Sequence, residues 1–134
     1  MAATDARELG APITGLSHVQ LFVSDVVVSA QWYRAVLGLI PYVEDLDVGY
    51  IALKHRDAKL VVVLTSGLAH GVDGVASQHL DHLAFAVRDA DALAAWTEHL
   101  SELGIDHPGV VLEGSHPSLQ LRDPDGVAIE LVAP

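Results

Sequence analysis

The sequence predicts an α+β fold built from two tandem βαβββ modules. The first observation is an internal repeat, because residues 16–36 align with residues 80–100 without a gap. The second is that each copy places a short alternating strand before an amphipathic helix, and the third is that three short apolar runs follow each helix. The matched pairs are Leu16 and Leu80, His18 and His82, Val23 and Val87, Asp25 and Asp89, Ala30 and Ala94, and Trp32 and Trp96.

Local signals place the elements of each copy in the same order. Asp25 and Asp89 follow the first strand of each copy and are of the residue type that caps a helix N-terminus. Gly38 and Gly104 stand where each helix should end, because glycine takes the left-handed C′ conformation without strain. The first copy is expected to contain strand 17–23, helix 27–37 and strands 42–44, 49–53 and 59–65. The second is expected to contain strand 81–87, helix 90–103 and strands 109–113, 118–122 and 127–132.

The helices are expected to bury one stripe each. Trp32, Val36 and Leu37 have helical spacing in the first, and Leu93, Trp96, Leu100 and Leu103 have it in the second. Both tryptophans are therefore expected to belong to the core rather than to a ligand site.

Length and composition predict one folded domain over residues 1–134. The chain has the usual size of a single domain, and 51% of its residues are hydrophobic, which is enough for a full core. Residues 1–14 are expected to be a flexible polar leader, and residues 67–78 a connector between the modules. The modules themselves are expected at residues 15–66 and 79–133.

Composition also narrows the partners. The chain has no cysteine, which excludes disulfides and thiolate metal sites and fits a cytoplasmic protein. Its net charge of −11 argues against binding to nucleic acid or to an anionic membrane surface. No apolar run approaches the roughly 20 residues of a membrane helix. A small-molecule substrate or ligand is the expected partner.

Three polar residues interrupt otherwise apolar strands. His18 and His82 occupy the same position of the two copies, opposite the aliphatic face that should pack under each helix. Glu130 follows the turn sequence Asp-Pro-Asp-Gly and alternates with Ile129 and Leu131. Two imidazoles and one carboxylate on a common concave side form the 2-His-1-carboxylate set that holds a divalent metal and leaves positions open. The alternative to a metal site is that each histidine is simply exposed or hydrogen-bonded and that the glutamate lies on an edge strand.

The sequence resembles the vicinal oxygen chelate superfamily in the segments HVQLFVSD, WYRAVLGL, DHLAFAV and RDPDGVAIELV. This superfamily includes glyoxalase I, extradiol dioxygenases and bleomycin-binding resistance proteins. The resemblance covers nearly the whole chain. It implies a partly closed, cup-shaped sheet with the metal ligands on its inner strands. Carried over by position, His18, His82 and Glu130 match the ligands of the first, fifth and eighth strands.

Departures from the family branches favour one reaction class. A resemblance to glyoxalase I would imply four metal ligands, one of them on the fourth strand. Here that strand offers Val62, Val63 and Leu64, which cannot bind a metal. The extradiol dioxygenases have three ligands, with Fe(II) as the usual metal. Their tyrosine on the seventh strand falls at Gln120, which donates a hydrogen bond but is no proton acid. His116, in a loop ahead of that strand, is expected to reach the mouth of the cup as a substrate-side group.

The leading interpretation is a metal-dependent, dioxygenase-like enzyme that chelates two adjacent oxygens of a small substrate. Fe(II) is the favoured ion, and Mn(II), Zn(II) and Ni(II) are the alternatives. A second interpretation is a non-catalytic binding protein of the bleomycin-resistance type, which the negative charge and the aromatic residues suit. A third is a glyoxalase-like lyase or isomerase. A homodimer is expected, with the modules swapped or paired between subunits.

Overall fold

The computed structural model of the chain describes residues 16–66, 80–113 and 116–134. The expected leader (1–14) and connector (67–78) lie outside these residues. The first module contains β1 (Val19–Phe22), α2 (Val26–Leu37), β2 (Ile40–Asp45), β3 (Tyr50–Lys54) and β4 (Val61–Thr65). The second contains β5 (Leu83–Ala86), α3 (Ala90–Glu102), β6 (Val110–Glu113), β7 (His116–Arg122) and β8 (Ala128–Val132). The two βαβββ modules of the α+β prediction are therefore confirmed.

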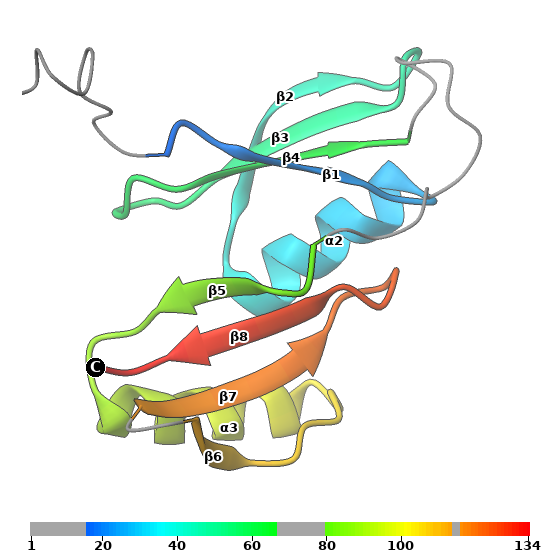
Figure 1. Cartoon of the computed structure of the whole chain (residues 1–134). Helices are drawn as coiled ribbons and strands as arrows, with labels where there is room; N and C mark the ends of the chain where they lie inside the picture. Colours follow the sequence, from blue (N-terminus) through cyan, green and yellow to red (C-terminus); the bar gives the residue numbers. More distant parts are fainter. Residues whose placement is uncertain (1–15, 67–79, 114–115) are drawn as a thin grey trace, which may run out of the picture.

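Each module forms one four-stranded mixed sheet, with order β1-β4-β3-β2 in the first and β5-β8-β7-β6 in the second (Figure 1). The first strand of each module pairs in parallel with the last, and the other neighbours are antiparallel. The parallel pair follows from the helix, which carries the chain back across the sheet before the next strand begins. Among the described residues β1 pairs only with β4 and β5 only with β8, so the two sheets are separate.

The helix ends lie where their capping residues predict. Asp25 accepts hydrogen bonds from the backbone N–H groups of Val27 and Val28, and Asp89 accepts one from Ala92. Gly38 and Gly104 have φ values of 72° and 71°, the left-handed conformation expected after a helix. No described helix has both the length and the apolar character needed to cross a bilayer.

Two local expectations are wrong. His116 is the first residue of β7 rather than a loop residue, because its backbone pairs with Glu113 across the β6–β7 hairpin. Leu103 is 44% exposed rather than part of the buried stripe, because α3 ends at Glu102 and the chain turns away there. The rest of the predicted stripe holds, since Leu93 and Leu100 are fully buried and Trp96 packs against them as part of the core.

The two modules share one hydrophobic core. Figure 1 shows α2 between the two sheets, where it covers one face of the first sheet and also meets the second module. Tyr33 on α2 is buried in this core, and Trp32 beside it is partly buried. His99 of α3 forms a hydrogen bond through Nε2 with the carbonyl of Val36, 3.0 Å away. The helix of the first module is thus the surface on which the second module rests.

The turn between β7 and β8 holds the second module against α2. Asp123 is 5% exposed, and its Oδ2 accepts a hydrogen bond of 2.8 Å from the hydroxyl of the buried Tyr33. Its Oδ1 accepts the backbone N–H groups of Asp125 and Val127 at 2.9 and 2.8 Å. Next to it, Asp125 Oδ1 accepts the hydroxyl and the backbone N–H of Ser24. Three donors compensate the buried carboxylate of Asp123, which is the condition for burying a charge without a large cost.

Burial and the neighbouring Asp123 carboxylate raise the pKa of Tyr33 far above its ordinary value. We therefore expect Tyr33→Phe to lower the free energy of unfolding by about 1.5–3 kcal/mol at pH 7, the range for a hydrogen bond to a charged group. A raised pKa contributes stability that is complete below about pH 10, where the unfolded tyrosine ionises, and that falls at higher pH. The difference between wild type and variant should therefore shrink as pH rises above about 10.

Urea unfolding at pH 7 and at several alkaline pH values measures both effects. Tyr42→Phe is the matched control, because Tyr42 is exposed and the substitution keeps its ring. Equal stability of the Tyr33 and Tyr42 variants would show that the Tyr33–Asp123 contact does not hold the modules together.

Candidate functional site

The second sheet presents Glu130 on the face opposite α3. Along β8, Ile129 and Leu131 point into the core, so Glu130 points to the other face. Its register partners on that face are Ala84 of β5 and Gln120 of β7. Glu130 as a residue is only 8% exposed, and the small side chains of Ala84 and Ala128 leave space beside it. A low-exposure carboxylate on an otherwise small-residue surface needs a compensating partner.

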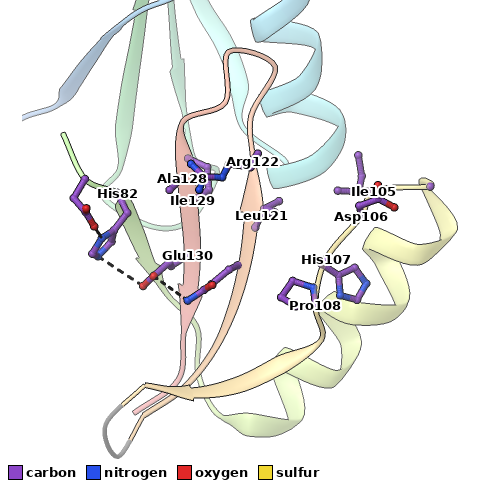
Figure 2. Close-up of a pocket in the computed structure, with 13 residues that line it drawn as sticks. His82, Ile105, Asp106, His107, Pro108, Leu121, Arg122, Ala128, Ile129 and Glu130 are labelled. Atoms are coloured by element: carbon purple, nitrogen blue, oxygen red, sulfur yellow. Dashed lines mark hydrogen bonds and ion pairs between the residues drawn. The ribbon is translucent and has the colours of Figure 1, made fainter. Parts of the chain in front are cut away.

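The side chains of His82 and Gln120 both lie against that carboxylate (Figure 2). His82 Nε2 lies 3.7 Å from Glu130 Oε2, and Gln120 Nε2 donates a 3.3 Å hydrogen bond to Glu130 Oε1. On the other side of the imidazole, His82 Nδ1 lies 2.7 Å from Asp81 Oδ2. The Asp81 carboxylate therefore occupies Nδ1 and leaves Nε2 directed toward Glu130. This is the arrangement by which a second carboxylate orients a metal-binding histidine, although Asp81 is 96% exposed and solvent weakens the contact.

These residues line an open hollow of about 980 Å³. Its walls come from residues 81–82 ahead of β5, from the loop 104–108 after α3, and from residues 120–122 and 128–130 of β7 and β8. Figure 2 shows His82 and Glu130 at one part of this surface and Arg122 beside Ala128 at another. A hollow of this size admits a small organic molecule next to the imidazole and the carboxylate.

The third predicted ligand lies elsewhere in the chain. His18 is exposed just before β1, and its Nδ1 lies 3.0 Å from Ser17 Oγ. His18 lies on the same face of the first sheet as Gln20, and the buried Leu21 lies on the opposite face. Helix α2 packs on the Leu21 face, so it separates the His18 face from the second module. Among residues 16–66, 80–113 and 116–134, no three histidine or carboxylate side chains lie close enough together to hold a metal ion. The chain thus brings together His82 and Glu130, while the three-ligand set remains a prediction.

The two predicted substrate-side residues have different positions. Gln120 lies in the hollow, where its amide fixes one carboxylate oxygen of Glu130. His116 is on the same face of β7, but it is exposed and does not line the hollow. Four residues of a strand span roughly 13 Å, which puts His116 well away from the carboxylate.

Sequence reasoning missed two contributors to the hollow. Asp81 contacts His82, and the loop 104–108 provides a wall. Arg122 was expected near the candidate site strands, and it lines the hollow. The role of Asp81 could have been predicted from the repeat. A side chain with an oxygen atom directly precedes each repeated histidine, Ser17 before His18 and Asp81 before His82. The loop could not have been found, because only the three-dimensional course of the chain after α3 brings it beside β7.

The fourth strand carries no ligand, as the sequence indicates. In β4, Val62 and Leu64 point into the core, and Val63 occupies the other face as the register partner of Gln20. A site assembled from the inner strands of the two modules would therefore have three protein ligands, not four.

Comparison with known proteins agrees with this fold. The family model of the Glyoxalase/Bleomycin resistance protein/Dioxygenase superfamily matches residues 15–131, and the chain belongs to that superfamily. A search of curated proteins returned no significant match.

Solved structures with this fold have low sequence identity to the chain. Lactoylglutathione lyase from Agrobacterium tumefaciens superposes with a TM-score of 0.75 at 17% identity, covering 91% of this chain and 95% of that one. An integron cassette protein from the mobile metagenome of the Halifax Harbour sewage outfall has a TM-score of 0.75 at 24% identity, with 91% and 100% covered. The fosfomycin resistance protein FosX from Listeria monocytogenes has a TM-score of 0.70 at 20% identity, with 90% and 91% covered. At these identities the likeness establishes the fold and not the reaction.

The site makes a stability prediction of its own. Glu130→Gln should leave the free energy of unfolding unchanged or raise it by up to about 1 kcal/mol, because it removes a poorly solvated charge and keeps the side-chain shape. His82, whose side chain is 41% exposed, is not left as a buried unpaired charge. Asp123→Asn is the comparison, because that carboxylate accepts three hydrogen bonds and its loss should cost stability.

Urea unfolding of the two variants at neutral pH measures the contrast. A loss in Glu130→Gln as large as that in Asp123→Asn would mean that Glu130 is retained for the fold and not for a ligand.

Proposed function

We propose that the protein is a metal-dependent vicinal oxygen chelate enzyme in which His18, His82 and Glu130 hold one divalent ion. The observation that carries this proposal is the pairing of a buried carboxylate with an imidazole nitrogen 3.7 Å away, the other nitrogen of which is held by Asp81. When bound, a divalent ion supplies adjacent positions for two oxygens of a substrate and Lewis-acid activation of them, or activation of dioxygen if it is iron.

The chain's own residues have separate roles in this proposal. His82 and Glu130 are donors of the residue types that such an ion takes, and the hydrogen bond from Gln120 fixes the orientation of the carboxylate. The small side chain of Ala128, which lines the hollow, leaves the space beside Glu130 in which a substrate would lie. Gln120 stands where a proton acid would be useful but supplies only hydrogen bonds, so proton transfer is assigned to the substrate or to water.

We favour a dioxygenase-like reaction with Fe(II). Three protein ligands leave the open positions that oxygen chemistry requires, and β4 offers no fourth ligand. Mn(II), Zn(II) and Ni(II) fit the same donors, and a mutant FosX from Listeria monocytogenes, 20% identical to this chain with a TM-score of 0.72, was solved with Mn(II) and 1S,2S-dihydroxypropylphosphonic acid. The rival functions are a glyoxalase-like lyase and a binding protein without turnover.

The third ligand comes from a second copy of the chain in this proposal. Within one chain α2 separates the face that carries His18 from the second module. A swapped homodimer would lay the first module of one copy over the hollow of the other, which would bring His18 to His82 and Glu130. The exposed Tyr42 and Val43 on β2 and the exposed Leu46 after it give the first module apolar surface that such a contact would cover.

Metal content tests the ligand set. Protein purified anaerobically without a histidine tag should contain about one transition-metal ion per chain, and His18→Ala, His82→Ala and Glu130→Ala should each contain almost none. Elemental analysis measures the metal, and far-UV circular dichroism confirms that each variant is folded. Iron in the wild-type protein would favour oxygen chemistry, and zinc or nickel the lyase. Absence of metal after anaerobic incubation with iron or manganese would leave the binding protein as the better description.

Mixing two inactive variants tests the sharing of the site between copies. His18→Ala and His82→Ala homodimers both lack a complete ligand set. In a swapped heterodimer, His18 of one chain meets His82 and Glu130 of the other, so one ion per heterodimer should return after the variants are unfolded and refolded together. Random pairing makes about half of the dimers heterodimers, so an equimolar mixture should recover about half an ion per dimer. If each chain builds its own site, the mixture should stay metal-free. Mixing His82→Ala with Glu130→Ala is the control, because both changes fall in the second module and no pairing restores three ligands.

A further inference from the structure

Arg122 stands on the same face of the second sheet as the candidate metal ligands. The register pairs Gln120 with Glu130 and Arg122 with Ala128, so all four side chains project to one side. Leu83 of β5 pairs with Ile129 of β8, so the preceding residue, His82, lies beside Ala128 on the side opposite to Arg122. Neighbouring strands lie about 4.8 Å apart, so the backbones of His82 and Arg122 are separated by roughly 10 Å with only a methyl group between them.

The guanidinium is held in place but has donors to spare. Arg122 Nη1 donates a 2.9 Å hydrogen bond to the carbonyl of Gly126 in the turn that joins β7 and β8. A guanidinium has five N–H donors, so this bond fixes its position and uses one of them. Among the described residues no carboxylate lies within ion-pair distance of Arg122, although Glu130, Asp81 and Asp106 line the same hollow.

We infer that Arg122 binds the carboxylate of a small organic acid, the other end of which lies at His82 and Glu130. This inference rests on the proposed function and assigns the substrate class to the same hollow. A planar guanidinium matches the two oxygens of a carboxylate in a paired geometry. A doubly charged phosphonate fits less well, because the hollow offers one guanidinium among three carboxylates.

The methyl group of Ala128 is what makes this arrangement possible. A larger side chain there would fill the space between His82 and Arg122. The substrate expected from this spacing carries two neighbouring oxygens at one end and a carboxylate a ring's width away.

A matched pair of probes tests the inference. 3,4-Dihydroxybenzoate and 4-methylcatechol share two neighbouring oxygens and differ in a carboxylate or a methyl group. Wild-type protein should bind the first about tenfold more tightly, the lower end of the range for hydrogen bonds between charged groups. Arg122→Gln should lose this preference, and Arg122→Lys should keep part of it, because it retains the charge without the planar fork.

Arg56→Gln is the control, because it removes the same charge from a side chain that is 80% exposed and outside the hollow. Isothermal titration calorimetry gives both dissociation constants, with Mn(II)-loaded and with metal-free protein. A wild-type protein that binds the two probes equally or binds neither, or a preference unchanged in Arg122→Gln, would overturn the inference. Lack of metal alone would overturn the proposed function, since the carboxylate preference is read in the metal-free protein as well.

Discussion

The arrangement of the whole chain depends on the burial of one carboxylate against one helix. Asp123 accepts the Tyr33 hydroxyl and two backbone N–H groups, and the two residues of the side-chain bond are 90 positions apart in the sequence. This contact fixes the β7–β8 turn on α2, so that the helix of the first module becomes a wall of the second. Because α2 is occupied in this way, the face of the first sheet that carries His18 lies on the side of that sheet away from the second module.

The same turn connects the core to the candidate site. Its last residues lead directly into β8, where Ile129 and Leu131 fill the core and Glu130 takes the opposite face. Arg122, on the strand before it, is anchored to the carbonyl of Gly126 within the turn. The side chains of the hollow are therefore held on rigid strands whose register the turn determines, which is the condition for placing donors accurately around a ligand.

Local chemistry allowed much of the fold to be predicted. The repeat, the caps at Asp25 and Asp89 and the alternation around Glu130 are short-range signals, and the structure has each of them. The Tyr33–Asp123 bond could not be predicted, because Asp123 reads in sequence only as the first residue of a turn. The separation of His18 from Glu130 was also hidden, because alternation reports which face of a strand a residue occupies and not where that face lies relative to another sheet.

A metal site shared between two copies of the chain would couple metal binding to dimer formation. In the proposed arrangement, His82 and Glu130 are preassembled in one module while His18 arrives with a second copy. An ion held by all three would then favour the dimer over the separated chains, and the dimer would equally raise the affinity for the ion, because such coupling is reciprocal. Burial of Glu130 in the single chain fits this division, since the residue is only 8% exposed and a cation held beside it would compensate the hydration that its carboxylate loses.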